Sequence, residues 1–523
     1  MGLLISRGQR PSFKWRPTQF ELGQSRTLPA PYAGLNLRDD ITTLKPNEAR
    51  VLENWIANTG KLKLREGYDD HATDVGSGDV PTLAAYQGLT TSKLIAASNG
   101  SVYDVTSAGS ATSKGSGFTE NRWQTACYNN KLVMVNGTDT PQTFDGSSLS
   151  GGGWTGTGLT ATNLINVALV RNRLWFCEKN SADVWYGGIG SITGSLTKFQ
   201  LSQIATGGIC MAIGSWSRDA GDGADDATVF VMSTGEIIVY QGDPATTFDL
   251  TGKFWTGASP IGRKCMTKVG GELVVITKLG YLPASAAVGG GSLSSVFGGT
   301  GMDLARIDPW GKIAPDVINK ADLYGDNLGW QATAHHGVLY VTIPTVAGTV
   351  ARHHALNIGT GSWSELSGWP SASMASFNDT LYMGSFNGTV LSVGSATDNG
   401  VNITSRASGA FVIPSSTQTN NLFTAARPKI VVAGNVSGVI GVDTEYVLRP
   451  YIGDSVDFSS GYVSTPWGSE WGSPWASSPT SAPTWFSVTG EGRSVSVRLS
   501  VTAESSDVQW FATDIAFKPG SIR

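Results

Sequence analysis

The stretch Cys127-Tyr-Asn-Asn-Lys-Leu-Val-Met-Val135 decides the fold, because its pattern returns several times along the chain. An apolar strand leads into a two-residue turn, and a second apolar strand follows the turn. Asn and Gly favour such turns because they tolerate the positive φ angles of tight hairpins. The pattern returns, with Asn, Gly or His at the turn, at 168–176, 266–276, 332–341 and 374–383, and in weaker form at 92–96 and 227–232.

The period of this repeat separates two all-β architectures. The anchoring apolar residues lie 38, 42, 55, 44, 66 and 42 residues apart, and they are Leu94, Leu132, Leu174, Val229, Leu273, Leu339 and Leu381. A propeller blade takes about 40–50 residues, whereas the strands of a sandwich recur about every 8–12 residues. Further tight turns extend the hairpins into meanders, which close radially because closure protects their edges. We therefore predict an irregular β-propeller of six or seven blades over residues 80–398.

The composition agrees with an all-β protein. Hydrophobic residues make up 40% of the 523 residues and charged residues only 15%, against roughly 25% charged residues in an average soluble domain. This balance argues against disorder, and it suits a protein that buries much of its surface in its own core or against copies of itself. The 66 glycines and 17 tryptophans are typical of pleated faces joined by many turns.

The regions before the propeller differ from it in pattern. Residues 1–26 read as an extended basic arm, with a net charge of +4 against −8 for the remainder of the chain. Residues 27–79 read as a helix-plus-strand segment that joins the propeller. Its helix is expected to start at Pro46 and to carry Glu48, Val51, Leu52 and Trp55 on one face. Asn58-Thr-Gly60 is expected to stop the helix, and residues 61–65 alternate like an edge strand.

A C-terminal β-rich domain is predicted over residues 399–523. Its expected antiparallel strands are Lys429–Ala433, Glu445–Ile452, Val495–Val501 and Val508–Phe517, of which the last three largely alternate with period 2. A loop rich in Trp, Pro, Ser and Gly, residues 466–485, lies between the second and third strands. A further helix is expected between Pro315 and Leu323, inside the longest insertion of the propeller.

Cysteines and hydropathy exclude several classes of protein. The four cysteines form no Cys-x-x-Cys pair, so we expect buried free thiols in strands rather than a zinc ribbon, a redox motif or a disulfide scaffold. No stretch of about eighteen apolar residues predicts a membrane span. The short apolar run Gly2–Ile5 is followed by basic residues, so a signal peptide is not expected. These features predict synthesis in the cytoplasm.

Three longer segments carry a more specific pattern. The first combines Pro31-Tyr-Ala-Gly-Leu-Asn-Leu-Arg-Asp-Asp40 with Asn54-Trp55, Gly60 and Leu64-Arg-Glu-Gly-Tyr68. The second combines Val239-Tyr-Gln-Gly-Asp-Pro244 with Ser259-Pro-Ile-Gly-Arg-Lys-Cys265 and Gly270-Gly-Glu-Leu-Val-Val-Ile-Thr277. The third combines Thr360-Gly-Ser-Trp363 with Gly368-Trp369, Leu381-Tyr-Met-Gly384 and Asn387-Gly-Thr-Val390. The C-terminal Trp467-Gly-Ser469, Trp471-Gly-Ser-Pro-Trp475 and Val508-Gln-Trp510 belong with them.

In these segments the chain resembles the tail nozzle proteins of short-tailed bacteriophages, also called tail tubular or DNA-stabilising hub proteins. The resemblance spans most of the chain. It implies a homo-hexameric ring below the portal and the adaptor, with double-stranded DNA passing through the ring without sequence-specific contacts. Tail fibre or spike proteins are implied as further partners, and the virion tail as the location.

Two groups of side chains in the sequence contain potential metal ligands. The pairs His335-His336 and His353-His354 supply few ligands for zinc, since neighbouring residues of a strand point to opposite faces. Asp219, Asp222, Asp225 and Asp226 lie among glycines, but their spacing does not match a calcium loop. Turn histidines and an acidic surface loop are the preferred interpretations. No metal or other cofactor is predicted.

Carbohydrate binding is the main rival function. Trp467, Trp471, Trp475 and Trp485 could present rings to sugars, although tryptophans in a Pro/Gly loop more often pack against a neighbouring sheet or subunit. No paired carboxylates for glycoside hydrolysis stand out, and no nucleophile, phosphate-loop or zinc-protease motif occurs. The alternative to a nozzle is therefore a glycan-binding virion propeller without hydrolysis, and no catalytic residue is predicted.

The sequence thus predicts a non-enzymatic structural subunit of a virus tail. Its channel-facing residues are expected to be mostly polar or acidic, because rows of Lys and Arg would grip DNA phosphates. The basic arm is the candidate for docking onto the adaptor ring, through Arg7, Arg10, Lys14 and Arg16.

Overall fold

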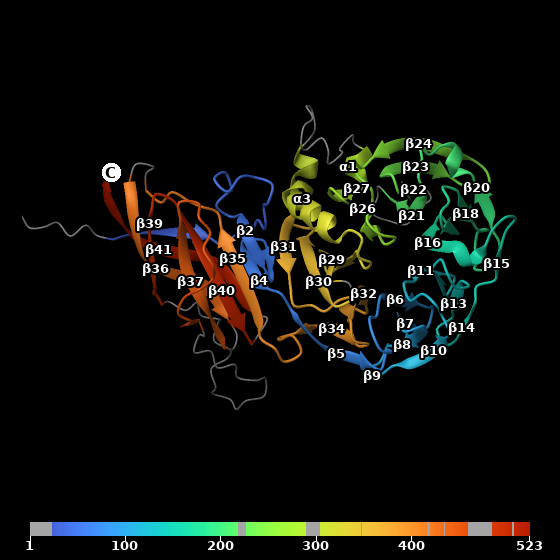
Figure 1. The fold of residues 1–523 in the computed structure, drawn as a ribbon, viewed down its shortest axis with the longest axis horizontal. Coiled ribbons are helices and arrows are strands. Elements are labelled where there is room, and N and C mark those ends of the chain that lie inside the picture. The colour runs from blue at the N-terminus through green and yellow to red at the C-terminus, as the bar shows by residue number, and fades with distance from the viewer. Residues whose placement is uncertain are drawn as a thin grey trace, which may run out of the picture.

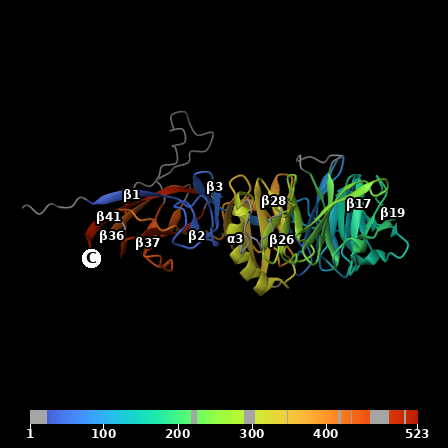
Figure 2. The same cartoon turned by 90° about the horizontal axis from the view of Figure 1, so that it is seen from above.

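The structure is a computed structural model, and it describes residues 23–217, 226–288, 304–346, 348–415, 419–432, 435–458, 484–504 and 507–522. These residues form two β-rich parts, a ring of small sheets and a sandwich of two sheets (Figure 1). The view from above shows the two parts side by side in a flat, elongated molecule (Figure 2).

The ring consists of antiparallel sheets that follow one another along the chain. The first sheet contains β6 (Thr82–Gln87), β7 (Ser92–Ser98), β8 (Ser101–Asp104) and β10 (Thr112–Ser116). The second contains β11 (Gln124–Tyr128), β12 (Lys131–Val135), β13 (Gln142–Phe144) and β14 (Leu149–Gly151). The third contains β16 (Leu164–Val170), β17 (Arg173–Glu178), β18 (Val184–Tyr186) and β20 (Thr197–Phe199). Two short strands, β15 (Trp154–Thr155) and β19 (Gly194–Ser195), pair beside the third sheet.

Four further sheets complete the ring in the described residues, which makes seven. They are β21 (Cys210–Trp216), β22 (Ala227–Met232), β23 (Glu236–Gly242) and β24 (Phe248–Trp255); β25 (Met266–Val269), β26 (Glu272–Thr277) and β27 (Gly280–Pro283); β28 (Gln331–His335), β29 (Val338–Val346), β30 (Val350–Asn357) and β31 (Ser362–Leu366); and β32 (Ser373–Phe377), β33 (Thr380–Gly384) and β34 (Val390–Ser395) with β5 (Gly67–Thr73) and β9 (Gly109–Ser110).

The ring closes through a strand from far upstream in the sequence. Strand β5 pairs with β34, with Ala72 opposite Val390, so it supplies the fourth strand of the last sheet. The first strand of that sheet, β32, contacts β6 of the first sheet, and each other sheet contacts the next one through its first strand. A radial array of antiparallel meanders, most of them four-stranded, that closes in this way is a β-propeller, and the predicted fold class is confirmed.

Tight turns join the first two strands of most blades, as the repeat predicts. Two consecutive residues with positive φ form the turn at Asn129-Asn130, Arg171-Asn172, His336-Gly337 and Asn378-Asp379. The strands that flank these turns pair directly, for example Tyr128 with Lys131. Such turns match the right-handed twist of a hairpin. They gather at one face of the ring, beside its axis.

In the described residues, two α-helices lie between the fifth and sixth blades. Helix α1 (Ala284–Val288) is short, and α3 (Leu304–Tyr324) contacts β27, β29 and β31. Ile313 and Val317 of α3 are fully buried in the largest core cluster. The predicted helix within residues 315–323 is therefore present, and it extends further toward the N-terminus than the pattern indicated. Two short 3₁₀ helices, η1 (Ala161–Asn163) and η2 (Leu201–Gln203), lie in the third blade.

The second part of the molecule is a β-sandwich that combines both ends of the described chain. One sheet contains β1 (Gln24–Pro29), β3 (Trp55–Asn58), β4 (Lys61–Leu64), β36 (Thr419–Val432), β39 (Phe486–Gly492) and β41 (Val508–Ile522). The other contains β2 (Ala49–Glu53), β35 (Ile403–Gly409), β37 (Val436–Thr444), β38 (Val456–Asp457) and β40 (Val495–Ala503). Phe423, Ile430 and Leu499 belong to the core between the two sheets.

The second sandwich sheet continues into the propeller. Strand β2 pairs in parallel with β31 of the sixth blade, with Glu53 opposite Glu365, and antiparallel with β35. The result is one nine-stranded sheet that runs from β28 in the ring to β38 in the sandwich. Paired backbone groups therefore cross the boundary between the two parts.

The helix predicted from Pro46 is wrong. The segment forms β2 and β3, separated by Asn54 with φ of 60°. Its apolar spacing fits a helix, but pairing with β31 and β35 decides the structure, since tertiary contacts override a weak local preference. Asn58-Thr-Gly60 is the hairpin turn between β3 and β4, and Gly60 has φ of 72°. The strand expected at residues 61–65 is present as β4, but it pairs with both β3 and β41 and is therefore not an edge strand.

The C-terminal strand predictions are mixed. Strands β36, β40 and β41 contain the described residues of three predicted strands, and β41 is longer than expected. The strand predicted at Glu445–Ile452 is wrong. Strand β37 ends at Thr444, and Glu445 and Tyr446 have φ of 53° and 61°, a left-handed backbone that ends an extended strand.

Candidate functional site

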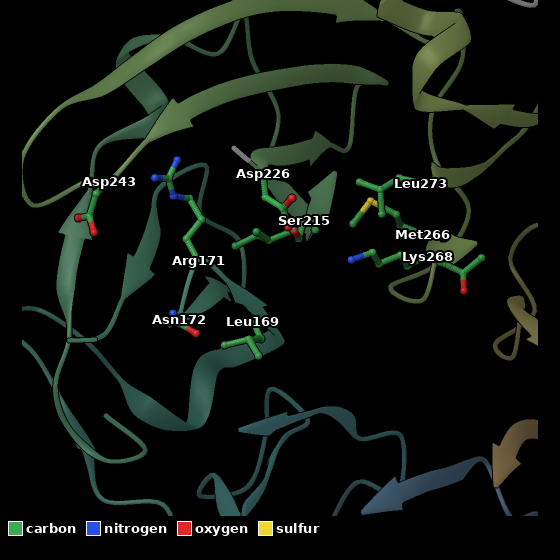
Figure 3. A pocket seen from close by; sticks show the side chains of 12 residues that line it. Leu169, Arg171, Asn172, Ser215, Asp226, Asp243, Met266, Lys268 and Leu273 are labelled. Atoms are coloured by element: carbon green, nitrogen blue, oxygen red, sulfur yellow. Dashed lines mark hydrogen bonds between the residues drawn. The ribbon is translucent and has the colours of Figure 1, made fainter. Parts of the chain in front are cut away.

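A hollow of the described residues lies on the propeller axis, at the face where the two-residue turns gather. It has a volume of about 670 Å³ and is bordered by the innermost strands of the third, fourth and fifth blades (Figure 3). We call it the axial cavity. Its lining residues are Leu169, Arg171, Asn172, Ile213, Gly214, Ser215, Asp226, Asp243, Met266, Thr267, Lys268 and Leu273. Cavities of about 300–1,000 Å³ are typical of ligand pockets.

The two carboxylates of the axial cavity have partners. Asp243 accepts hydrogen bonds from Arg173, whose Nη2 lies 2.9 Å from Oδ1, and from the backbone amide of Ala245. Burial opposes ionisation of Asp243, but the Ala245 amide and Arg173 outweigh it and hold the pKa of this carboxyl below its usual value. Asp226 accepts a hydrogen bond of 2.6 Å from the Ser215 hydroxyl. Neither carboxylate is therefore an uncompensated charge.

At the other end of the axis, two basic side chains cross the ring. Arg263 and Lys264 precede β25 of the fifth blade. The guanidinium of Arg263 donates to the carbonyl of Asn136 in the second blade at 3.1 Å, and the amine of Lys264 lies 3.5 Å from the carbonyl of Pro81 beside the first blade. Loss of hydration, helped by the nearby Arg122 cation, lowers the pKa of Lys264 to about 8. These contacts across the ring obstruct the propeller's own axis.

A buried polar network lies where the propeller joins the sandwich. Asn54, 4% exposed, donates to the hydroxyl of Ser367 and to the carbonyl of Thr404. Its side-chain oxygen accepts hydrogen bonds from the Nε of Arg65 and the backbone amide of Ser367. One side chain thus contacts the last blades, β35 and the strand that leads into β5. We call this group, with Arg65 and Asp398, the junction network.

Arg65 provides the strongest ion pair of the junction network. Its side chain is 2% exposed, and its two terminal nitrogens contact the two carboxylate oxygens of Asp398 at 2.7 and 2.6 Å. Nη2 also donates to the carbonyl of Ser367, and the guanidinium lies 5.4 Å from the ring centroid of Trp369. A paired, planar guanidinium is well suited to a fixed structural position.

A second network holds the N-terminal loop and helix α3 together. Asn36 donates to Asp39 and Glu48, and Lys312 of α3 forms an ion pair of 3.0 Å with Glu48. The Arg38 guanidinium beside Asp39 lowers the pKa of that carboxyl to about 2, against a smaller opposing effect of burial. Asn36 and Glu48 are themselves buried. The residues that resemble the nozzle family in this loop therefore have structural partners.

The histidine pairs do not converge. His335 and His336, at the turn between β28 and β29, stack on each other at 3.9 Å between ring centroids. His353 and His354 are instead buried in β30, so the turn position expected for this pair is wrong. The Nε2 of His354 lies 2.7 Å from Asp316 Oδ2 and 3.0 Å from Lys320 Nζ, both of α3. Its Nδ1 lies 2.8 Å from the hydroxyl of Tyr281. These contacts fix α3 against the sixth blade, and burial and Lys320 lower the pKa of His354.

His353 points to the opposite side of β30 and has neither ring nitrogen hydrogen-bonded among the described residues. It is fully buried, and its ring meets that of Trp369 edge to face at 5.7 Å between centroids. Burial, with Arg65 and His354 adding to it, lowers the pKa of His353 to about 3. His353 is therefore neutral in the folded protein at ordinary pH.

Several residues proposed from the sequence lie outside the described residues. They are the arm residues Arg7, Arg10, Lys14 and Arg16, the loop residues Trp467, Trp471 and Trp475, and Asp219, Asp222 and Asp225. Within the described ranges, no group of three or more His, Cys, Asp or Glu side chains is placed to hold a metal ion. No aromatic side chain lines the axial cavity, so its described walls offer no ring on which a sugar could stack.

The cysteines are free, as expected. Cys177, Cys210 and Cys265 are buried, whereas Cys127 is partly exposed. The sulfur atoms of Cys177 and Cys210 lie 3.3 Å apart, a proximity that their wide separation in sequence did not indicate. None of the helices in the described part of the chain has the length and apolar character that a membrane crossing requires.

The axial cavity and the junction networks were not predicted as sites. The signal for the cavity was present in the repeat, because Arg171 stands where the other two-residue turns have Asn, Gly or His. The signal for the junction was the set of polar residues inside the family-like segments, Asn36, Asn54 and Arg65.

Comparisons with known proteins assign no family to the chain. No protein-family model matches the chain, and no curated protein matches it. The computationally designed Ika8 protein is 12% identical with a TM-score of 0.38, and the match covers 62% of this chain and 99% of Ika8. The WD40 β-propeller domain of Doa1 is 12% identical with a TM-score of 0.38, covering 63% and 97%. PorZ of Porphyromonas gingivalis is 10% identical with a TM-score of 0.36, covering 65% and 42%.

The ring of sheets within the chain itself places it in the class of β-propeller proteins.

Proposed function

We propose that the chain is a structural subunit of the tail nozzle of a short-tailed bacteriophage. In this proposal, copies of the chain form a closed ring, a homo-hexamer, below the adaptor and the portal. Double-stranded DNA leaves through the centre of this ring, and tail fibre or spike proteins attach around it. The subunit is made in the host cytoplasm, resides in the virion tail and performs no catalysis.

The observation that carries this proposal is the buried junction between the two parts of the molecule. The segments that resemble the nozzle family supply Asn54 and Arg65, which are both buried and hydrogen-bonded there. Together with the nine-stranded sheet, they join the propeller and the sandwich into one stiff unit. A stiff unit suits a closed ring, because a fixed angle between neighbouring copies determines whether the ring closes.

The obstructed propeller axis restricts where DNA can pass. Arg263 and Lys264 cross the ring, and the cavity at the opposite face is far smaller than a duplex. A DNA passage therefore has to lie between subunits. We expect the walls of that passage to carry mostly polar or acidic side chains. A cryo-EM reconstruction with stacked rows of Arg and Lys facing the DNA would contradict this expectation.

The decisive experiment is negative-stain imaging of the purified protein with the portal and the adaptor. Closed rings stacked on the portal axis would support the proposal. Rings, if formed, should also retain their symmetry in the variant Lys198→Gln, which changes an exposed position of the outer strand β20. Monomers that never join a portal–adaptor complex, under conditions where portal and adaptor join each other, would reject it.

The basic arm is the proposed contact with the adaptor. A variant that lacks residues 2–22 tests this contact. The deletion ends there because β1 begins at Gln24 and pairs with β41, so the edge of the sandwich stays intact. We expect the truncated protein to fold with an unchanged midpoint of thermal unfolding but to lose attachment to the adaptor. Replacing the four arm cations by Gln tests charge alone. Unchanged attachment in both variants would remove the arm from the proposal.

A further inference from the structure

We propose that the axial cavity is a binding site for an acidic peptide segment of another protein, and that Arg171 binds a carboxylate of that segment. The site is separate from the junction network and from the proposed contacts between nozzle subunits. It would operate whether or not the chain forms a ring.

Arg171 is unusual for its position in the fold. It begins the turn between β16 and β17 with φ of 49°, a left-handed backbone that Arg adopts at a cost and Asn adopts readily. The corresponding turns of the second and seventh blades begin with Asn129 and Asn378, and that of the fifth blade with Gly270. A strained residue is an observation that calls for a functional explanation, and Arg171 is the residue of these turns that could bind an anion at the axis.

The guanidinium of Arg171 is available to a ligand. It has no hydrogen bond or ion pair with any described residue, and the side chain is only partly buried at the edge of the axial cavity (Figure 3). Asp243 is the neighbouring carboxylate, but Arg173 holds it through three contacts of 2.9 to 3.2 Å. Asp226 is bonded to Ser215. Arg171 lies near enough to Asp243 to contribute to the lowered pKa of that carboxyl, but it forms no ion pair with it among the described residues.

The walls of the axial cavity indicate what accompanies the carboxylate. Leu169, Ile213, Met266 and Leu273 supply apolar surface next to Arg171. A free dicarboxylate would fill only a small part of about 670 Å³, whereas a few residues of a peptide could place an acidic side chain on Arg171 and an aliphatic one on these walls. Guanidinium groups bind carboxylates in a planar, two-contact geometry. An acidic–aliphatic peptide therefore fits the site better than a sugar, for which the described lining offers no aromatic ring.

The test uses the full-length protein and a fluorescein-labelled pentapeptide of alternating leucine and glutamate, followed by fluorescence anisotropy at low salt. The matched probe has glutamine in place of glutamate. We expect saturable binding of the glutamate peptide and at least about tenfold weaker binding of the glutamine peptide, since a charged hydrogen bond is lost. Unlabelled glutarate should compete only weakly. Equal competition by glutarate would overturn the assignment to a peptide.

The informative variant is Arg171→Asn, because Asn suits the left-handed turn and is the residue found there in the second and seventh blades. We expect its thermal midpoint to be equal to or higher than that of the wild type, while affinity for the glutamate peptide falls at least about tenfold. Arg171→Lys should retain part of the affinity, and the distant Lys198→Gln should retain all of it. Wild-type affinity in Arg171→Asn, or no saturable binding to the wild type up to about 1 mM, a limit at which binding is already weak, would overturn the proposal.

Discussion

The ion pair between Arg65 and Asp398 allows a test of how much a single residue of the junction contributes to the free energy of unfolding. Replacing Arg65 by Ala leaves a largely buried carboxylate and the Asn54 oxygen without their main partner. We expect a loss of about 3–5 kcal/mol in the free energy of unfolding, the usual cost of breaking a buried pair. Urea denaturation measures it. Lys198→Ala is the matched control, because the pair of Lys198 with Asp183 has a side chain 43% exposed and should cost less than about 1 kcal/mol.

Asn54 and Arg65 of this junction stand in sequence segments with a recognisable pattern, but the pattern could not give their role. Arg65 and Asp398 are more than three hundred positions apart, so nothing in the local pattern pairs them. The same holds for Asn54, whose partners include Ser367, directly after the sixth blade, and Thr404 on β35. Periodicity reports which residues are apolar on one face, whereas a buried polar contact depends on where distant segments meet.

His353 makes stability depend on pH. Its pKa of about 3 in the folded protein is lowered mainly by burial, whereas the unfolded value is about 6.5. The unfolded chain therefore binds the proton more tightly, and the stability present above pH 6.5 is lost as the pH falls toward 3, by up to about 1.4 kcal/mol for each pH unit. We expect His353→Leu to flatten the decline between pH 6.5 and 4.5, measured by urea denaturation. His354 remains and keeps part of the slope. Parallel curves for variant and wild type would contradict this account.

At the level of elements, two glycines distinguish a connection that is packed against a strand from one that lies in open space. Gly34 has φ of 83°, and a Cβ there would lie 2.7 Å from the backbone nitrogen and oxygen of Trp363 in β31. Gly60, in the β3–β4 turn, has φ of 72° and open space around it. Both Ala variants incur the left-handed backbone cost, about 1–2 kcal/mol. We expect Gly34→Ala to lose about 1–3 kcal/mol more, the cost of overpacking. Equal losses of stability in the two variants, measured by thermal denaturation, would show that β31 shifts to make room for the added methyl group.

The elements also show where sequence patterns suffice. Two-residue turns with Asn or Gly between apolar runs predicted the blades, because hairpin geometry is local. The segment after Pro46 has apolar residues at 51, 52 and 55 that fit a helix, yet it forms two strands because β31 and β35 offer it paired edges. The strand predicted at residues 445–452 is wrong for a similar reason, since the chain turns at Glu445 just after β37. Local alternation cannot reveal which edge a segment will meet.

At the scale of the whole molecule, the propeller and the sandwich should unfold as one unit. Tyr281 and Val341 of the propeller share a core cluster with Trp55 and Phe423 of the sandwich, and one sheet spans both parts. Separate unfolding would have to open this core and leave β31 with an unpaired edge. We therefore expect one calorimetric transition, with equal calorimetric and van't Hoff enthalpies.

Two matched variants test this cooperativity, because each removes the same atoms from a different part. Leu174 in the third blade and Leu499 in the centre of the sandwich are both fully buried, and each change to Ala should cost about 2–5 kcal/mol. If the molecule is one unit, either variant shifts the single transition as a whole. If Leu174→Ala instead split off an early transition and left a later one at the wild-type temperature, the parts would be independent. A hinge between them would then weaken the case for a ring built on fixed angles.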